Sequence, residues 1–332
     1  MSVQGAPMLA VEGLKKTFNL TSGLFSPPVI LTALDDINFE VQRGETVGIV
    51  GESGCGKSTL GRCILQLLKP DERKVLWLGE DLTKIDAEKM RRRRSDLQII
   101  FQDPLASLNP RMTVGDIISD PLRTLMPELS RKERRGRVLR MMEAVGLLPE
   151  MTNRYPHEFS GGQAQRIGIA RALITEPKLI VCDEPVSALD VSIQAQILNL
   201  LSQLKEEFGL TLIFISHDLS VVRHISDRIM VLYLGRMVEY ATCDALYDDP
   251  RHPYTKALLT AVPVPDPRKA RERSFDGLEG EIPSPINPPS GCTFRTRCRH
   301  AQDICAIEPS RVEPIDDVRL ISCHRWREIA SG

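Results

Sequence analysis

Apolar residues recur along this chain with two periods, one typical of strands and one typical of helices. Residues 8–19 and 29–41 alternate apolar and polar side chains, which predicts half-buried antiparallel strands. Continuously apolar runs, which predict buried strands, occupy residues 45–50, 97–101, 179–182 and 210–215. The chain is therefore expected to have an α/β fold that contains a buried parallel sheet.

Segments with helical spacing separate these strands. Apolar residues recur at intervals of three and four in residues 60–68 and 164–174. A further helix is expected to begin after Asp190 and to end at about Phe208. Residues 111–155 are amphipathic and rich in Arg and Met, and they predict a small helical subdomain. The basic run Arg91–Arg94 is expected on a solvated helix face rather than at a phosphate or partner site.

One stretch joins the first buried strand to the helix at residues 60–68 and follows the pattern G-x-x-x-x-G-K-[ST]. Its residues are Gly51, Glu52, Ser53, Gly54, Cys55, Gly56, Lys57, Ser58 and Thr59. Glycines allow successive backbone N–H groups to surround a phosphate, and the following helix N-terminus adds positive partial charge. We expect Lys57 to reach the β and γ phosphates of a nucleotide, Ser58 to bind Mg²⁺ and Thr59 to contact the α phosphate.

Polar side chains follow three of the buried strands. Asp183 and Glu184 form an adjacent pair of carboxylates, which is costly unless the pair meets a cation or takes part in chemistry. One can hold hydrated Mg²⁺ and the other can polarise an attacking water. Gln102 and His217 follow two other strands, where ligands bind in α/β proteins, although a satisfied core histidine is the alternative for His217.

Three further features are candidates for a binding site or for local structure. Ser160, Gly161, Gly162 and Gln163 precede a helix and offer a second anion site. Asp190 is expected to be the N-cap of the helix that ends near Phe208. Phe18 precedes a turn-rich insertion at residues 21–28 and is a candidate to stack on an adenine, with packing in a half-buried strand as the alternative.

Composition narrows the class of protein. The 332 residues are 42% hydrophobic, which is ample for a core, and the net charge of −1 gives no reason to expect nucleic acid as a partner. The first eight residues lack the pattern of a signal peptide, and no apolar stretch of about 18 residues occurs. We therefore expect a reducing cytosol, in which the eight cysteines are thiols or metal ligands before they are disulfides.

The order and spacing of these motifs resemble the ATP-binding cassette (ABC) superfamily over residues 8 to about 245, with Phe159 at a position where the superfamily usually has Leu. Three further segments, 101–112, 250–258 and 291–298, resemble the ATPase subunits of bacterial dipeptide and oligopeptide importers. The resemblance implies an ABC nucleotide-binding domain at 8–249, with a RecA-like core, an antiparallel β subdomain and a helical subdomain at about 104–173. A C-terminal region with clustered cysteines would follow at 250–332.

The function that this resemblance implies is ATP hydrolysis that powers import of di- or oligopeptides across the bacterial inner membrane. The alternatives are an importer of the same family for a nickel complex, an opine or a sugar-derived compound, or a soluble ABC ATPase in DNA repair or translation. The implied partners are a second ABC ATPase, expected to be a paralogue, two integral-membrane permease subunits and an extracytoplasmic solute-binding protein. The expected location is the cytoplasmic face of the inner membrane.

The resemblance also assigns roles within the site, with ATP and Mg²⁺ as cofactors. Catalytic roles fall to Lys57, to Glu184 as the general base or water-orienting carboxylate, to His217 as the γ-phosphate clamp, and to Gln102 beside the metal or attacking water. Ser58, Gln102 and Asp183 are the expected magnesium ligands. Two cassettes would hold each ATP between the P-loop of one and the Ser160–Gln163 signature of the other, with Asp190 close by.

Four of the cysteines lie together in the C-terminal region, with the spacing Cys292-x5-Cys298-x6-Cys305-x17-Cys323. In a reducing compartment such a cluster predicts a metal site, but the paired spacing typical of zinc is absent. Resemblance to the peptide-importer ATPases implies a 4Fe-4S cluster with a stabilising role, while zinc or an empty site remain open. Nearby basic residues would offset the charge of such a cluster; they are Arg295, Arg297, Arg299 and His300.

Overall fold

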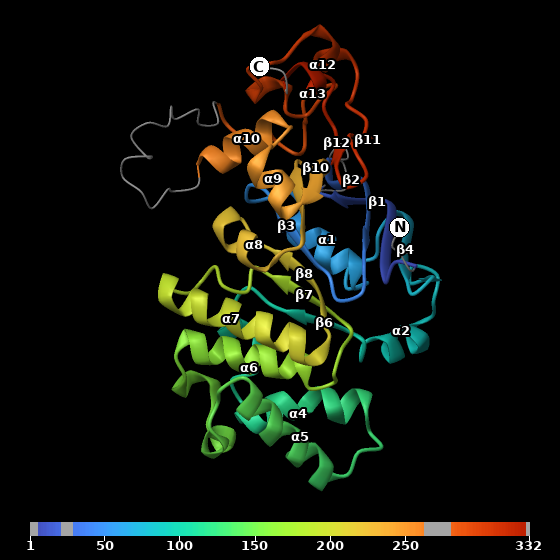
Figure 1. Ribbon diagram of the computed structural model, residues 1–332. Helices are drawn as coiled ribbons and strands as arrows, with labels where there is room; N and C mark the ends of the chain where they lie inside the picture. Colours follow the sequence, from blue (N-terminus) through green and yellow to red (C-terminus); the bar gives the residue numbers. More distant parts are fainter. Residues whose placement is uncertain (1–5, 21–28, 262–279, 330–332) are drawn as a thin grey trace.

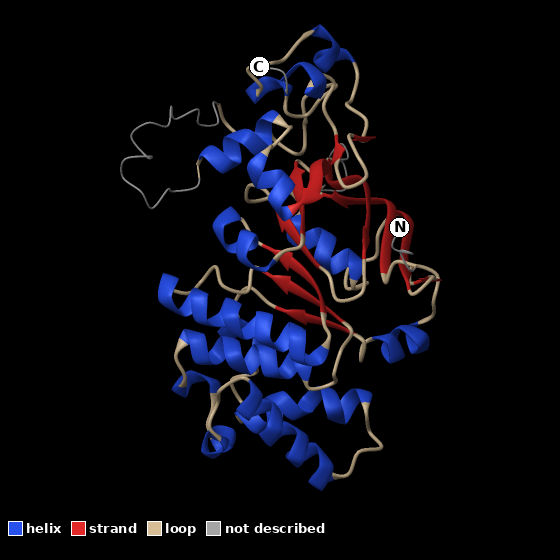
Figure 2. Cartoon of the chain, in the orientation of Figure 1, coloured by secondary structure: helices blue, strands red, loops and turns tan. Residues whose placement is uncertain are grey.

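A computed structural model describes residues 6–20, 29–261 and 280–329. The turn-rich insertion predicted at residues 21–28 lies outside the described residues. Two sheets and the helices around them make up the described chain (Figures 1 and 2). Within these residues, no helix is both long enough and apolar enough to cross a membrane.

The larger sheet contains the strands that were predicted from continuous apolar runs. Its parallel strands, in spatial order, are β9 (Arg228–Tyr233), β3 (Thr46–Val50), β8 (Thr211–Ile215), β7 (Leu179–Asp183) and β6 (Leu97–Ile100). Every residue of β3, β7 and β8 is buried, as expected for strands covered on both faces. The parallel order aligns their carboxyl ends along one edge of the sheet.

The smaller sheet is antiparallel and confirms the alternating pattern near the N-terminus. Its strands, in spatial order, are β2 (Ile30–Val41), β1 (Leu9–Asn19), β4 (Glu72–Trp77) and β5 (Glu80–Asp81). Apolar residues of β1, β2 and β4 share one hydrophobic core with residues of β3 and with the helix α1 (Lys57–Ile64). This sheet therefore packs against the element that follows the P-loop.

The helices group into two sets. Helices α7 (Val191–Phe208) and α8 (Leu219–Ile225) share a hydrophobic core with the large sheet, whereas Arg93 of α2 (Ala87–Arg93) pairs with Glu80 of β5 in the small sheet. A second set lies at the lower end of the molecule in Figure 1 and comprises α3 (Pro104–Ser107), α4 (Val114–Leu125), α5 (Arg131–Ala144), the short 3-10 turns η1 (Pro149–Asn153) and η2 (Pro156–Glu158), and α6 (Gly161–Leu173). The helical character predicted for residues 111–155 is present.

Local caps explain where two of these helices begin. The carboxylate of Asp190 accepts a hydrogen bond from the backbone N–H of Ile193 at 2.9 Å, so the predicted N-cap of α7 is confirmed. The hydroxyl of Ser160 accepts from the N–H of Gln163, whose side chain accepts in return from the N–H of Ser160. The signature residues therefore form a capping box at the start of α6.

The basic run at residues 91–94 differs from its prediction most clearly at Arg94. Arg92 is exposed and pairs with Glu88, as a solvated helix face requires. Arg94, however, is only partly exposed, and its guanidinium donates to the carbonyl oxygens of Leu65 and Gln66 at 2.6 and 3.2 Å. The prediction is wrong for Arg94 because the last carbonyls of a helix need donors, and this side chain supplies them for α1.

The C-terminal region adds to the large sheet. Strand β10 (Arg236–Thr242) and helix α9 (Cys243–Asp248) precede this region, whose own described elements are α10 (Pro253–Thr260), η3 (Arg295–Arg297), α12 (Asp303–Ile307), β11 (Glu313–Pro314), β12 (Leu320–Ile321) and α13 (Trp326–Ile329). Strand β10 pairs antiparallel with both β9 and β12, and β12 pairs with β11. The end of the chain therefore extends the same sheet that carries the P-loop.

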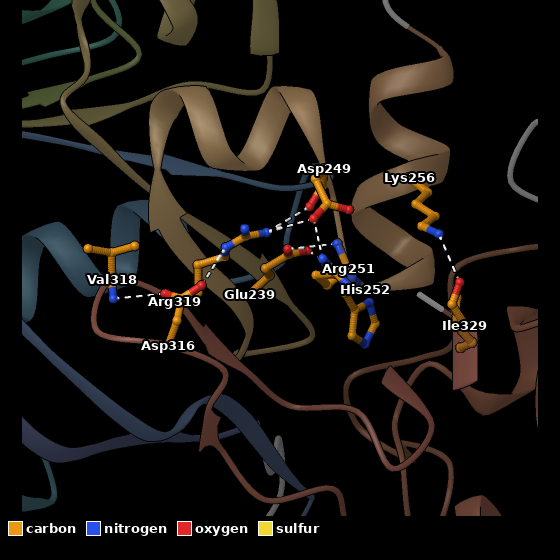
Figure 3. Close-up of polar contacts among 9 residues, drawn as sticks. All are labelled: Glu239, Asp249, Arg251, His252, Lys256, Asp316, Val318, Arg319 and Ile329. Atoms are coloured by element: carbon orange, nitrogen blue, oxygen red, sulfur yellow. Dashed lines mark hydrogen bonds and ion pairs between the residues drawn. The ribbon is translucent and has the colours of Figure 1, made fainter. Parts of the chain in front are cut away.

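Polar contacts fasten this region to β10 (Figure 3). The buried carboxylate of Glu239 accepts from the backbone N–H groups of Arg251 and His252, each at 2.9 Å. Burial raises the pKa of Glu239. Arg319, which directly precedes β12, donates to the side chain of Asp249 at 3.2 Å. A buried carboxylate without these donors would be costly, so the contacts fix the position of the segment after α9.

Candidate functional site

The predicted P-loop lies between β3 and α1, and a side chain would not fit at two of its glycines. Gly51 has φ 154° and Gly56 has φ 106°. A Cβ on Gly51 would lie 2.2 Å from the carbonyl oxygen of Leu232, and one on Gly56 would lie 2.4 Å from that of Ala33. Glycine is therefore required at both ends of the loop.

The ammonium of Lys57 is held inside this loop. It donates to the carbonyl oxygens of Gly51 and Glu52 at 2.8 and 3.1 Å, and only 4% of its side chain is exposed. The carboxylate of Glu184 lies 4.0 Å from the ammonium. A cation held in this way, next to the N-terminus of α1, favours an anionic ligand in front of the loop.

Asp183 is the last residue of β7 and is buried. Its carboxylate accepts a hydrogen bond from the hydroxyl of Ser58 at 2.6 Å, and Arg62 lies 4.0 Å away. Burial raises the pKa of Asp183, while the Ser58 hydroxyl and the Arg62 cation oppose that rise. The predicted magnesium ligands Ser58 and Asp183 are thus in direct contact.

Glu184 is the point where the ends of three strands meet. The side chain amide of Gln102, after β6, donates to its carboxylate at 3.1 Å. Nδ1 of His217, after β8, lies 3.3 Å from the same oxygen. Glu184 itself has φ 49°, and its N–H donates to the carbonyl of Ile215 at 3.0 Å. Residues far apart in the sequence therefore converge on one carboxylate.

These groups line a cavity of about 710 Å³. Predicted site residues on its wall are Phe18, Gly51, Glu52, Ser53, Gly54, Gly56, Lys57, Ser58, Thr59, Gln102, Glu184 and His217. The ring of Phe18 lies there with the ammonium of Lys16 5.5 Å from its centroid. Cys55 is not on the wall; it is buried, and burial raises the pKa of its thiol.

The signature residues Ser160, Gly161, Gly162 and Gln163 do not line this cavity, nor does Asp190. Ser160 and Gly161 are exposed at the start of α6, and Asp190 is exposed at the start of α7. Phe159, just before the signature, is 8% exposed and packs in the core, so the apolar character of this position is kept. Within one chain, the signature and the P-loop are therefore separate surfaces.

One contact at the P-loop was not predicted. The carboxylate of Glu52 forms a bidentate ion pair with the guanidinium of Arg297, with N–O distances of 2.7 and 3.0 Å. Arg297 was expected to offset the charge of a cysteine-held cluster, but its guanidinium is turned to the P-loop. The two residues are 245 positions apart, and no spacing rule relates them.

The four clustered cysteines lie in one part of the C-terminal region. The N–H of Cys292 donates to the carbonyl of Cys305 at 2.8 Å. Burial raises the pKa of Cys323 to about 12, and the charges of Cys292, Cys298 and Cys305 add to the rise. No three His, Cys, Asp or Glu side chains in the described ranges are arranged to hold a metal ion. The structure therefore gives no support to the predicted metal site.

The fold and this cavity together are those of an ATP-binding cassette. The cassette MJ0796, solved as a dimer bound to ADP and Pi, superposes with a TM-score of 0.64 at 32% identity, over 71% of this chain and 99% of that one. CbiO1 of Clostridium perfringens, part of the transporter complex cbiONQ, gives 0.63 at 29% identity, over 73% and 91%. The family profile "ABC transporter" matches residues 34–187.

Relatives and a second family profile show which kind of ABC transporter this chain resembles. The profile "Oligopeptide/dipeptide transporter, C-terminal region" matches residues 238–305. The oligopeptide transport ATP-binding protein OppF of Salmonella typhimurium is 61% identical over 90% of each chain. The dipeptide transport ATP-binding protein DppF of Haemophilus influenzae is 50% identical over 96% of this chain and 97% of its own. The chain belongs to the family of ATP-binding subunits of peptide ABC transporters.

Proposed function

We propose that this chain binds MgATP in the cavity at the P-loop and that its hydrolysis powers peptide import through a multisubunit ABC transporter. The observation that carries the proposal is the convergence of Lys57, Gln102, Glu184 and His217 on one cavity. The match of the C-terminal region to peptide transporters favours peptides over the other solutes considered.

The nucleotide is held mainly by the P-loop. Lys57 neutralises the β and γ phosphates, the backbone N–H groups around Gly54 and Gly56 surround the phosphates, and Thr59 contacts the α phosphate. Ser58 and Asp183 would hold Mg²⁺, which would supply further charge neutralisation at the phosphates. The hydrogen bond that already joins these two side chains supports this assignment. Phe18, on the wall of the same cavity, stacks on the adenine.

Hydrolysis needs a water molecule oriented toward the γ phosphate. Glu184 acts as the general base or water-orienting carboxylate, because it lies within 4.0 Å of Lys57 and faces the cavity. His217 contacts the γ phosphate, and Gln102 contacts the metal or the attacking water. The contacts of both side chains with Glu184 support these roles, since a bound nucleotide would lie among the three.

The complete site is composite. The cassette MJ0796 has been solved as a dimer, and we infer the same kind of pairing for this chain. The signature Ser160–Gln163 of one cassette, together with Asp190, then closes the nucleotide against the P-loop of the other. The exposure of Ser160 and Gly161, and the absence of the signature from the cavity wall of its own chain, support this arrangement. The expected cassette partner is a paralogous ATPase.

The remaining partners follow from the transporter class. Permease subunits and a solute-binding protein complete a peptide ABC importer, with this chain at the cytoplasmic face of the bacterial inner membrane. We divide the chain into a nucleotide-binding domain at 8–249, with its helical subdomain at about 104–173, and a C-terminal region at 250–332.

The composite site makes a direct prediction for the purified chain. Alone and monomeric, it is expected to hydrolyse ATP about 10²-fold more slowly than in the assembled transporter, because one side of the triphosphate lacks its charge stabilisation. Phosphate release, measured together with mass by light scattering, tests this. Co-purification of the native complex identifies its permease and second ATPase.

A variant of the signature residues tests the composite site in a second way. Ser160→Arg places a bulky cation at the exposed start of α6 and should abolish turnover in the complex. MgATP binding by the isolated chain should be unchanged, because Ser160 does not line that chain's own cavity. Rapid hydrolysis by a strictly monomeric preparation would refute the composite site.

We also propose that Cys292, Cys298, Cys305 and Cys323 bind a 4Fe-4S cluster that stabilises the C-terminal region. The clustering of four cysteines in the sequence and the match of this region to the peptide-transporter C-terminal profile motivate the proposal, and the four side chains must draw together to ligate iron. Anaerobically purified protein is expected to show a broad absorption near ~400 nm and about four irons per chain. Cys305→Ala should lose the iron and Cys243→Ala, outside the group, should keep it. Stoichiometric zinc without visible absorption would overturn the proposal.

A further inference from the structure

We propose that Arg297, in the C-terminal region, is a positioning residue of the nucleotide site and acts through the P-loop residue Glu52. By neutralising and orienting the Glu52 carboxylate, Arg297 keeps the loop in a form that accepts an anionic phosphate chain. This inference rests on the proposed assignment of nucleotide binding to the P-loop.

The ion pair has the geometry of a specific contact. Both terminal nitrogens of Arg297 engage the two oxygens of Glu52, at 2.7 and 3.0 Å. The side chains are only 4% and 20% exposed, respectively. A bidentate, largely buried pair fixes orientation as well as charge, unlike a mobile surface pair.

The same loop residue is held at its backbone from the C-terminal side. The N–H of Glu52 donates to the hydroxyl of Tyr254 in α10 at 3.0 Å. The ring of Tyr254 packs against Tyr233 and Phe294, with centroid distances of 4.7 and 5.4 Å. Phe294 directly precedes η3, which contains Arg297. Elements beyond residue 250 therefore hold both the side chain and the main chain of Glu52.

Glu52 is also in direct contact with the phosphate-binding lysine. Its carbonyl oxygen accepts from the ammonium of Lys57 at 3.1 Å, and it lies on the wall of the cavity. A carboxylate at this place carries the same sign as a triphosphate and would oppose its binding if it were unpaired. Arg297 removes that penalty and fixes the residue that orients Lys57.

The test uses the full-length chain and MgADP as the probe, with affinity measured by calorimetry. Arg297→Met is expected to weaken MgADP binding about tenfold, because it leaves the Glu52 charge unpaired beside the phosphates. Adding Glu52→Gln to that variant should restore most of the affinity, since it removes the repelling charge. In the assembled transporter, Arg297→Met should raise the KM for ATP and leave kcat nearly unchanged.

Two controls separate this role from a structural one. Arg295→Met changes the neighbouring arginine of η3, which donates to the carbonyl of Ser290 and not to the P-loop, and should leave MgADP affinity at the parent value. Lys57→Ala should abolish most binding; if it does not, the site assignment itself fails. If Lys57→Ala weakens binding but Arg297→Met does not, only the role of Arg297 is refuted.

The double variant gives the decisive outcome. A role limited to holding the C-terminal region in place predicts that Glu52→Gln gives no rescue, and that result would overturn the proposal. If Arg297→Met does not fold, as judged by thermal unfolding, Glu52→Gln alone decides. It should bind MgADP at least as tightly as the parent chain, because the variant removes a negative charge beside the phosphates; weaker binding overturns the proposal.

Discussion

Glu184→Gln is expected to leave ATP binding intact and to lower the turnover of the assembled transporter by about 10²- to 10⁴-fold. The substitution keeps the shape of the side chain and one acceptor oxygen for Gln102 and His217, but it removes the carboxylate that orients or deprotonates the attacking water. ATP-bound dimers should accumulate, because closure no longer ends in hydrolysis. Steady-state phosphate release and the mass of the nucleotide-bound species measure the two effects.

The same chemical change at an exposed position serves as the control. Glu206 is exposed on α7, and Glu206→Gln should retain the parent rate of ATP turnover. Calorimetry on both variants separates binding from chemistry. Turnover of Glu184→Gln near the parent rate would remove Glu184 from its catalytic role, whereas loss of ATP binding would show that the substitution had disturbed the cavity.

Much of the fold could be predicted because burial leaves a periodic signal in the sequence. The runs that became β3, β7 and β8 are apolar at every position or nearly so, since helices or loops cover both faces of the sheet. The cap at Asp190 could also be predicted, because a capping side chain acts within three residues of its own position.

The polar side chains of the cavity at the strand ends could be predicted for a related reason. Parallel strands end at one edge of a sheet, so polar residues that follow β6, β7 and β8 must meet there. Gln102, Glu184 and His217 are brought together by this rule. The P-loop carries a local pattern of its own, in which glycines at fixed offsets have backbone angles that other residues avoid.

Contacts between distant segments could not be predicted. Nothing in the sequence distinguishes Arg94 from Arg92. The contact of Arg94 with the end of α1 depends on how α2 packs. Glu52 and Arg297 are likewise ordinary surface residue types, and only the folded chain brings them together. The contribution of the C-terminal region to the P-loop therefore became visible only in three dimensions.

Lys57→Ala is expected to weaken MgATP binding by roughly 10- to 100-fold, because it removes a charge-assisted contact to the β and γ phosphates. Turnover should fall in step, since the same charge stabilises the transition state. Calorimetry with MgATP on the isolated chain measures the affinity, and phosphate release by the assembled transporter measures the turnover. Lys84→Ala, whose parent side chain is 73% exposed on the surface, should change neither quantity.

Loss of the ammonium also has a structural consequence that the experiment must separate. In the parent chain the Lys57 ammonium donates hydrogen bonds to the carbonyl oxygens of Gly51 and Glu52, and the variant removes this donor from both. Thermal unfolding of the nucleotide-free chain reports this effect, and Arg297 and Tyr254 should still hold Glu52 in place. A variant that unfolds at the parent temperature yet binds MgATP weakly assigns the loss to the phosphates. Unchanged affinity would show that the anion site lies elsewhere.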